Sequence, residues 1–151
     1  LGAEVFAVDI DDEKLNIARE YGASRVIKYD PERFKADLAE LGEITAIFDT
    51  VAIAGMLGDC LDILARGGKI VCVGYGKGKE LRLDFERLVL HEIEVIGARG
   101  ATIQELTETM RLVAAGKIRP VVTDIFSLEE LNEAAERLRS GRIRCRAVVK
   151  P

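Results

Sequence analysis

The sequence has few residues that could bind a structural metal ion or form disulfide bonds. Among its 151 residues there are three cysteines and one histidine, His91. The cysteines, Cys60, Cys72 and Cys145, are far apart and form no CxxC pair. A structural zinc site needs about four clustered thiolate or imidazole ligands. We therefore interpret the cysteines as small buried residues of a protein in a reducing cytoplasm.

Long apolar runs and an excess of positive charge are also missing. No run approaches the roughly 18 apolar residues of a membrane-spanning helix. The first ten residues carry two acids instead of the basic segment of a secretory signal. The net charge of −4 disfavours nucleic acid as a partner. The five arginines from Arg137 to Arg146 fit a solvated helix end, so we expect neither a nucleic-acid nor a membrane partner.

Short apolar runs alternate with helical patterns along most of the chain. A chain of 151 residues, 48% of them apolar, can build a domain with a real core. Apolar strands separated by helices predict a parallel sheet in an α/β fold, covered by helices on both faces. The predicted strands are residues 5–8, 25–28, 45–48, 70–73, 94–96, 121–125 and 146–149.

Capping residues and glycines set the expected helix boundaries. The first helix should open at Asp11 and Asp12 and stop at Gly22, and a short helix should cover residues 84–90. Asp30 and Pro31 predict an N-cap and first helical position for the second helix. The other expected features are a third helix with Leu57, Leu61 and Leu64 on one face; a capping box at Thr102–Glu105; and a second box at Ser127–Glu130, opening a helix with Leu128, Leu131, Ala135 and Leu138 inward.

Asp9 is the strongest candidate for a ligand-binding residue. It follows the apolar residues 5–8 and precedes the first helix, whose N-cap is already supplied by Asp11 or Asp12. In nucleotide-binding α/β folds, an acid at this place accepts hydrogen bonds from the adenosine ribose hydroxyls. The same acid would repel a 2′-phosphate, which favours NAD over NADP. Lys14, in the first turn of the helix, is either a second contact to the ribose or a plain surface lysine.

Two segments at the ends of later strands are weaker candidates. Residues 73–78 form a glycine-rich loop, but no helix follows at the distance that a phosphate-binding loop requires. This loop and residues 49–51 would lie at the carboxyl edge of a parallel sheet, where ligands bind. Close backbone approach to a flat ligand and ordinary turn chemistry are both open for them. His91 lacks a partner at a suggestive spacing, and we do not expect it to be a catalytic base.

Together these segments resemble the zinc-dependent alcohol dehydrogenase branch of the medium-chain dehydrogenase/reductase superfamily. Each matching segment is weak alone, but their order and spacing are highly specific. The segments are Leu1-Gly2-Ala3-Glu4-Val5 before Asp9, Tyr21-Gly22-Ala23, Phe48-Asp49-Thr50-Val51, Arg66-Gly67-Gly68-Lys69-Ile70-Val71 before Val73-Gly74, Glu94-Val95-Ile96-Gly97, Gly116-Lys117-Ile118-Arg119-Pro120 and residues 142–151.

The resemblance implies hydride transfer between an alcohol and NAD, with a catalytic zinc that polarises the substrate oxygen. It also implies a small-molecule alcohol or carbonyl substrate and a homodimer or homotetramer that pairs near residues 94–97. Carried over by position, the cofactor-binding residues would be Asp9 and Lys14 at the ribose, Ile10, Thr50 and Val51 on the adenine side, Val73, Gly74 and Tyr75 at the nicotinamide, and Arg146 at the phosphates.

Several parts of the family pattern are missing from residues 1–151. The zinc ligands, the proton relay, the first Rossmann strand and the GxGxxG motif would all precede Leu1. The residue before Arg146 is usually glycine and here is Cys145, which weakens the implied role of Arg146. We therefore expect the carboxyl-terminal portion of a larger protein. Its parts would be a partial NAD-binding Rossmann domain, residues 1–100, and a segment returning to the catalytic domain, residues 101–151.

The fold expected from this resemblance is an incomplete doubly wound parallel sheet. In the strand order 3-2-1-4-5-6 the missing strand is central, so the strands at 5–8 and 45–48 would each lose a neighbour. We expect the isolated chain to be poorly stable, inactive and weak in NAD binding. Alternatives are a zinc-free quinone or enoyl reductase, which generally uses NADP, a non-catalytic nucleotide-binding module, and a methyltransferase. The sequence does not identify the substrate.

Overall fold

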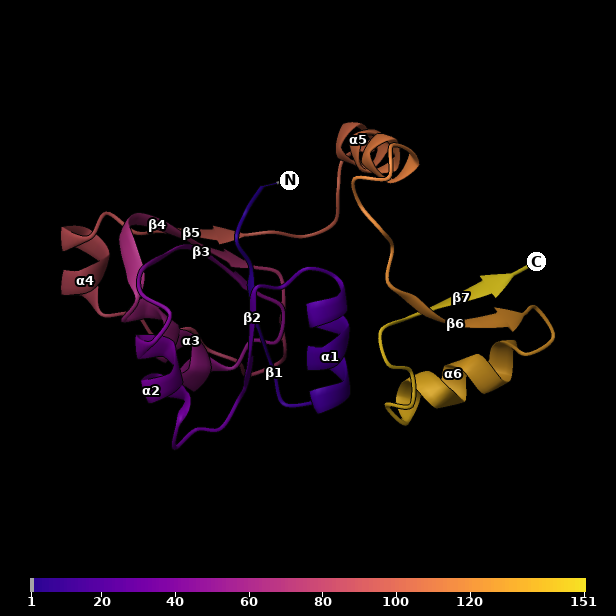
Figure 1. Ribbon diagram of the computed structural model, residues 1–151, viewed down its shortest axis with the longest axis horizontal. Helices are drawn as coiled ribbons and strands as arrows, with labels where there is room; N and C mark the ends of the chain where they lie inside the picture. The colour runs from indigo at the N-terminus through magenta and orange to yellow at the C-terminus, as the bar shows by residue number, and fades with distance from the viewer. Residues whose placement is uncertain (1) are drawn as a thin grey trace. The chain divides into compact units, whose positions relative to one another are not determined.

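Helices and strands alternate along the whole described chain. The computed structural model describes residues 2–151, without the side chain of Ala54, so that Leu1 of the resemblance lies outside it. The predicted α/β class is confirmed (Figure 1). The elements are β1 (Phe6–Asp9), α1 (Asp12–Glu20), β2 (Arg25–Lys28), α2 (Phe34–Ala39), β3 (Ile44–Asp49), α3 (Ala54–Leu61), β4 (Leu64–Cys72), α4 (Phe85–Leu90), β5 (Glu94–Gly97), α5 (Ile103–Ala114), β6 (Val122–Ser127), α6 (Leu131–Arg139) and β7 (Arg146–Lys150).

The strands form three parallel sheets, β1-β2, β3-β4-β5 and β6-β7. Every pair joins strands that are consecutive in the sequence, with a helix between them, as parallel pairing requires. Within residues 2–151, β1 is paired along one edge, with β2, and β3 along one edge, with β4. These are the two strands for which the sequence predicted the loss of a neighbour.

Helix α1 follows directly from its sequence. Asp11 caps it, because the Asp11 carboxylate accepts hydrogen bonds from the backbone N–H groups of Glu13 at 2.8 Å and Lys14 at 3.4 Å. Acidic residues in the first turn favour this helix end. The helix ends at Glu20 with Tyr21 as its C-cap, and Gly22 follows with a φ of +99°, which glycine adopts without strain. Leu15 faces the core and is buried. The Asp11 cap and Gly22 confirm the predicted start and end of this helix.

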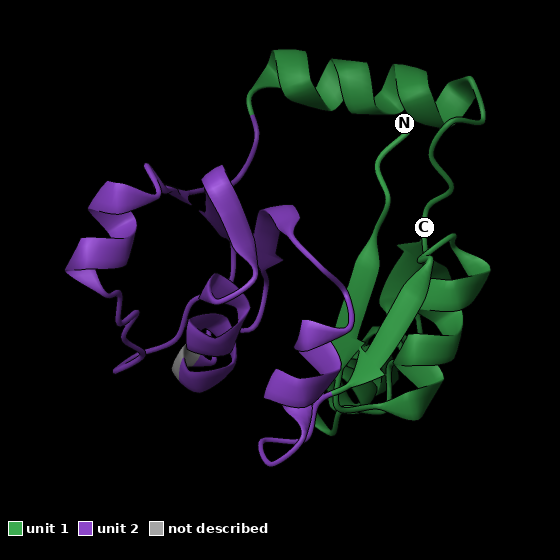
Figure 2. Ribbon diagram, turned by 60° about the vertical axis from the view of Figure 1, so that its left-hand side comes forward, with its two compact units in different colours: residues 1–28, 102–151 green, residues 29–101 purple. Residues whose placement is uncertain are grey.

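The described chain divides into two compact units, coloured separately in Figure 2. Unit 2, residues 29–101, contains the sheet β3-β4-β5 with α2, α3 and α4. Its core joins Leu57 and Leu61 of α3 to Leu64 and Ile70 of β4 and to Ile93. The division into functional domains at residue 100 stays a prediction.

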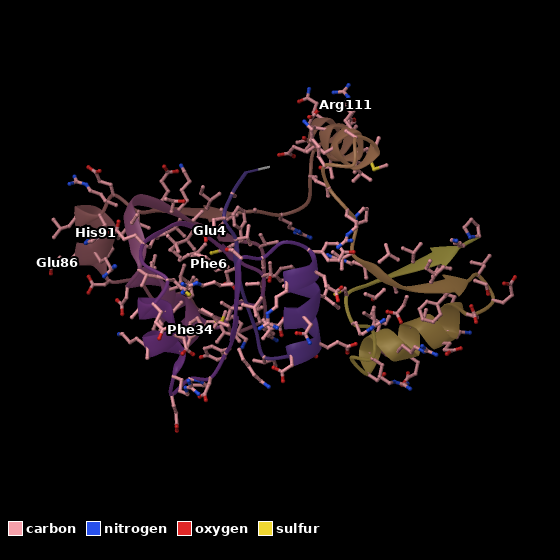
Figure 3. The ribbon with its side chains drawn as sticks, viewed as in Figure 1. Glu4, Phe6, Phe34, Glu86, His91 and Arg111 are labelled. Atoms are coloured by element: carbon pink, nitrogen blue, oxygen red, sulfur yellow. The ribbon has the colours of Figure 1, made fainter. Side chains whose placement is uncertain are left out.

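Phe34 of α2, labelled in Figure 3, is fully buried. Its ring meets the Tyr29 ring edge-on, with the two ring centres 5.0 Å apart. By contrast, Phe48 of β3 exposes 70% of its surface. Its neighbours Ile47 and Asp49 point to the opposite face, because successive side chains of a strand alternate.

Unit 1, residues 2–28 and 102–151, contains the sheets β1-β2 and β6-β7 with α1, α5 and α6. Arg119 links the two chain segments of the unit: its guanidinium lies 3.8 Å from the centre of the Tyr21 ring and donates to the Glu20 carbonyl oxygen at 3.1 Å. The Tyr21 hydroxyl donates to the Pro120 carbonyl oxygen at 3.2 Å. The core residues of this unit are Leu15, Ile27, Phe126 and Ala134.

Four local expectations are wrong. Leu64 lies in β4 instead of α3, because it pairs with Ile44 and enters the core, and an irregular register before the Ala46–Lys69 pair accommodates Gly67 and Gly68. Helix α2 starts at Phe34, since residues 31–33 form a turn. The N–H groups of Glu32, Arg33 and Phe34 all donate to Asp30.

The second capping box is the third of these errors. Ser127 ends β6, and α6 starts only at Leu131. Half of the expected box is nevertheless present, because the Ser127 N–H donates to the Glu130 carboxylate at 2.7 Å. The residues expected to face inward also differ: Leu128, Leu131 and Leu138 are all more than half exposed, and Ala134 is the buried residue of the helix. A two-stranded sheet offers too little surface to cover all of them.

Candidate functional site

The carboxyl end of β1 holds Asp9 in a fixed position. Asp9 is half-buried, and its Oδ1 accepts a hydrogen bond from the Asp11 N–H at 3.0 Å. Asp11 caps α1, so Asp9 is not needed as the N-cap. An ionised carboxylate has acceptor capacity for about four hydrogen bonds. Asp9 therefore retains acceptor positions for a diol such as a ribose.

The surroundings of Asp9 are partly apolar and otherwise charged. Ile10 follows directly and exposes 68% of its surface, and Lys14 is exposed in the first turn of α1. Lys28, at the end of β2, is the direct ladder partner of Asp9 and forms an ion pair with Asp12. The sequence reasoning missed Lys28, although a lysine at the end of the next parallel strand was a usable signal.

Arg146, the candidate phosphate contact, lies in the same unit. It is exposed at the start of β7. Two residues earlier, Arg144 forms an ion pair with Glu13 of α1 at 2.9 Å, which ties this segment to the helix that follows Asp9. Between them, the Cys145 N–H donates to the Thr123 hydroxyl at 3.1 Å.

Other arginines near the carboxyl end are paired with acids of their own helix. Arg137 pairs with Glu133 at 2.6 Å and Arg139 with Glu136 at 3.8 Å. These pairs fit the interpretation of a solvated helix end.

A second group of candidate residues lies at the carboxyl ends of β3 and β4 in unit 2. Four of these residues are exposed: Thr50, Val51, Val73 and Tyr75, with Tyr75 at 87%. By contrast, Asp49, the last residue of β3, is only 5% exposed. The structure thus places Asp9, Ile10, Lys14 and Arg146 in one unit and Thr50, Val51, Val73, Gly74 and Tyr75 in the other.

Gly74 permits a close backbone approach, and its partner is protein. A Cβ added to Gly74 would lie 2.3 Å from the Thr50 carbonyl carbon and 2.5 Å from the Val51 nitrogen. Side chains essentially never make contacts this short, so glycine is required here. After Gly74 the chain is irregular up to Asp84, which caps α4 through the Arg87 N–H at 3.1 Å. No helix follows the glycine-rich loop directly, consistent with the rejection of a phosphate-binding loop.

The described residues contain no cluster suited to a metal ion. Among residues 2–151, no group of three or more histidine, cysteine, aspartate or glutamate residues is arranged to bind one. Burial, and then the charges of Asp59 and Asp49, raise the pKa of the Cys60 thiol to about 11. Burial and Asp49 also raise the pKa of Cys72. Both thiols are therefore protonated near neutral pH, whereas a cysteine that binds a metal or acts as a nucleophile must be a thiolate.

His91 has a structural position at the end of α4 (Figure 3). Its backbone N–H donates to the Arg87 carbonyl oxygen at 3.0 Å, and its own carbonyl accepts the Gly67 N–H at 2.7 Å. These bonds fix the return of the chain toward β5.

No described helix is both long and apolar enough to cross a membrane.

Comparison with known proteins shows the family. The family model of the zinc-binding dehydrogenases matches residues 1–115. The alcohol dehydrogenase of the hyperthermophilic archaeon Aeropyrum pernix is 32% identical, with a TM-score of 0.78, over 99% of this chain and 43% of that one. The cobalt- and zinc-bound thermostable alcohol dehydrogenase of Pyrobaculum aerophilum is 29% identical, also at 0.78, over 100% and 44%.

An NAD-dependent alcohol dehydrogenase is 25% identical, with a TM-score of 0.83, over 99% of this chain and 44% of that one. The chain thus spans less than half the length of these structures. The predicted resemblance, the Rossmann-like α/β fold and the oxidoreductase family are confirmed. The chain belongs to the zinc-binding dehydrogenase family, and it corresponds to the carboxyl-terminal portion of the zinc-dependent alcohol dehydrogenases in the medium-chain dehydrogenase/reductase superfamily.

Proposed function

We propose that the whole protein transfers hydride between a small alcohol and NAD, and that residues 1–151 contribute part of its NAD-binding surface. The observation that carries the proposal is Asp9. It ends β1, α1 starts immediately after it under a separate cap, and its carboxylate has acceptor capacity left. These are the requirements for holding the ribose hydroxyls of an adenine dinucleotide.

The other residues of unit 1 would complete the adenosine side of the site. The exposed Ile10 offers an apolar surface for the adenine, and Lys14 could donate to a ribose oxygen. Arg146 would bind the diphosphate, because a guanidinium donates two parallel hydrogen bonds to phosphate oxygens. The ion pair between Arg144 and Glu13 supports this by tying the Arg146 segment to α1.

In unit 2, Thr50 and Val51 would border the adenine side, while Val73, Gly74 and Tyr75 would lie beside the nicotinamide. Bound NAD would supply the hydride acceptor: the alcohol loses a hydride to NAD⁺ and a proton to solvent, giving a carbonyl compound and NADH. The role of these residues is to orient the coenzyme and to keep water from the nicotinamide. We propose, as the family resemblance implies, that the zinc ligands of the whole protein lie outside residues 1–151.

The proposal is tested with the whole gene product, supplied with NAD or NADP and a panel of primary and secondary alcohols. We expect NADH formation that is lost after zinc chelation. NADPH-dependent reduction of quinones or enoyl compounds, unaffected by chelation, would instead identify a zinc-free reductase. NAD binding without turnover of any substrate would identify a binding module.

We also propose that residues 1–151 alone are inactive and bind NAD weakly. Within the described residues, β1 and β3 each have one paired edge, and an unpaired edge leaves backbone groups without partners. Isothermal titration of the isolated chain with NAD tests this. Micromolar affinity together with cooperative unfolding would contradict it.

The same family resemblance leads us to propose a homodimer or homotetramer that pairs along β5. Val95 and Ile96 of this edge strand are 41% and 39% exposed. Sedimentation of the whole protein, with a charged substitution at Ile96, would test this interface.

A further inference from the structure

The turn that follows β3 is organised by a buried carboxylate. Asp49 is 5% exposed, and its Oδ1 accepts hydrogen bonds from the N–H groups of Val51 at 3.0 Å and Ala52 at 2.9 Å. Burying a carboxylate is unfavourable unless it is hydrogen-bonded, so these two bonds belong to the reason it can lie there. Ala52 takes a φ of +59°, a left-handed conformation that residues other than glycine rarely adopt. The surrounding bonds thus hold the turn in one particular shape.

The main chain of Asp49 also holds the segment after β4. Its carbonyl oxygen accepts hydrogen bonds from the N–H groups of Val73 at 2.8 Å and Gly74 at 2.9 Å. The absence of a side chain on Gly74 lets this segment pack directly against the Thr50 backbone. One residue therefore connects both loops at the carboxyl edge of the sheet.

We infer that Asp49 is a positioning residue of the coenzyme site. This rests on the proposed function, in which Thr50, Val51, Val73, Gly74 and Tyr75 border NAD. All five lie on the two loops that Asp49 joins. Its carboxylate binds backbone N–H groups of its own turn and does not touch the coenzyme. Its effect is to fix both loops before NAD arrives, which reduces the ordering that binding would otherwise require.

Substitutions in the whole protein test the inference, with the KM for NAD and kcat measured separately. Asp49→Asn retains an oxygen acceptor and should leave the KM for NAD within about threefold of the wild-type value. Asp49→Ala removes the acceptor, and Gly74→Ala forces the loops apart. Each should raise the KM about tenfold, the effect of one to two net hydrogen bonds, with kcat at saturating NAD changed much less.

Asp30→Ala is the matched control. The Asp30 carboxylate accepts a similar backbone hydrogen bond, from the Glu32 N–H at 3.0 Å, in an exposed turn of the same unit. This variant should leave the KM for NAD unchanged. An unchanged KM in Asp49→Ala, or an equal loss in Asp49→Asn, overturns the positioning role.

Hydrogen exchange of the wild-type protein keeps the inference testable if Asp49→Ala does not fold. The Val51 and Ala52 amides should be protected before NAD is added, because Asp49 already binds them. Exchange as fast as in an unstructured peptide overturns the inference. A wild-type protein that does not bind NAD overturns the proposed function as well, whereas normal NAD binding with an unaffected Asp49→Ala variant overturns this inference alone.

Discussion

Coenzyme selectivity offers the sharpest test of the adenosine side of the site. Asp9 and Lys28 are ladder partners at the ends of β1 and β2, and neighbouring strands lie about 4.8 Å apart. Lys28 is held by Asp12, at the start of α1. An acid that would repel a 2′-phosphate thus has a cation beside it. We predict that Asp9→Ser gains activity with NADP and that Lys28 contributes to this gain.

The size of the effect follows from the local charges. A 2′-phosphate on a ribose bound by Asp9 would lie about 4 Å from the carboxylate, where two unit charges repel by about 1 kcal/mol in water and about 4 kcal/mol at an effective dielectric constant near 20. Asp9 is half-buried, so the repulsion lies between these limits, equivalent to a preference for NAD of about 5-fold to 1,000-fold. Lys28 is largely exposed and shared with Asp12, so its attraction is at most about 1 kcal/mol, or about fivefold.

The assay compares kcat/KM for NADP and NAD in the whole protein at low and high salt. Asp9→Ser should shift the ratio toward NADP by at least about fivefold, and Asp9→Ser/Lys28→Gln should reverse up to about fivefold of this gain. Asp9→Ser/Arg19→Gln is the control, since Arg19 lies in the last turn of α1 and its loss changes the net charge equally. An unchanged ratio in Asp9→Ser would refute the placement of the ribose. Equal losses in the two double variants would show that Lys28 acts only through net charge.

Three further predictions concern the free energy of unfolding. Gly68→Ala should lower it by about 1–3 kcal/mol in urea denaturation, because the new Cβ would lie 2.6 Å from the Leu64 side chain and 2.8 Å from the Ala65 carbonyl oxygen. Gly58→Ala should raise it by about 0.5–1 kcal/mol, since the new methyl group meets open space within α3; a loss would show that α3 is not helical there. Between pH 9 and 11 the free energy of unfolding should fall as pH rises, because the unfolded Cys60 thiol ionises near 9.0 and the folded one at about 11. Cys60→Ala should remove this part of the slope, and identical profiles would contradict the raised pKa.

Local sequence signals predicted elements where they agree with long-range packing. The Asp11 cap and Gly22 bound α1, and Thr102 with Glu105 forms the capping box of α5, all as expected. The error at Leu64 has a different origin. Leu57, Leu61 and Leu64 have helical spacing, yet Leu64 pairs with Ile44. A strand containing two glycines carries little local strand signal, and only tertiary pairing reveals it.

Only part of the candidate site could be predicted from the sequence, because some of its contacts join residues that are far apart in the chain. Asp9 could be named from its place at the end of β1, and the residues after β3 and β4 because paired parallel strands bring their carboxyl ends to one edge of their sheet. That Asp49 is buried and joins two loops could not, since its partners Val73 and Gly74 are distant in sequence and bond through backbone atoms. An aspartate directly after a strand favours a turn closed by its own side chain, which was the available signal.

The pairing of each strand with the next one along the chain has a consequence for folding during synthesis. Parallel sheets usually fold slowly, because distant segments must meet before any contact forms. Here the loop to be closed for each pair contains a single helix, and its entropy cost is modest. Once residue 28 has left the ribosome, β1, α1 and β2 are all present. We therefore expect β1, α1 and β2 to pack together before the residues of the later sheets have been translated.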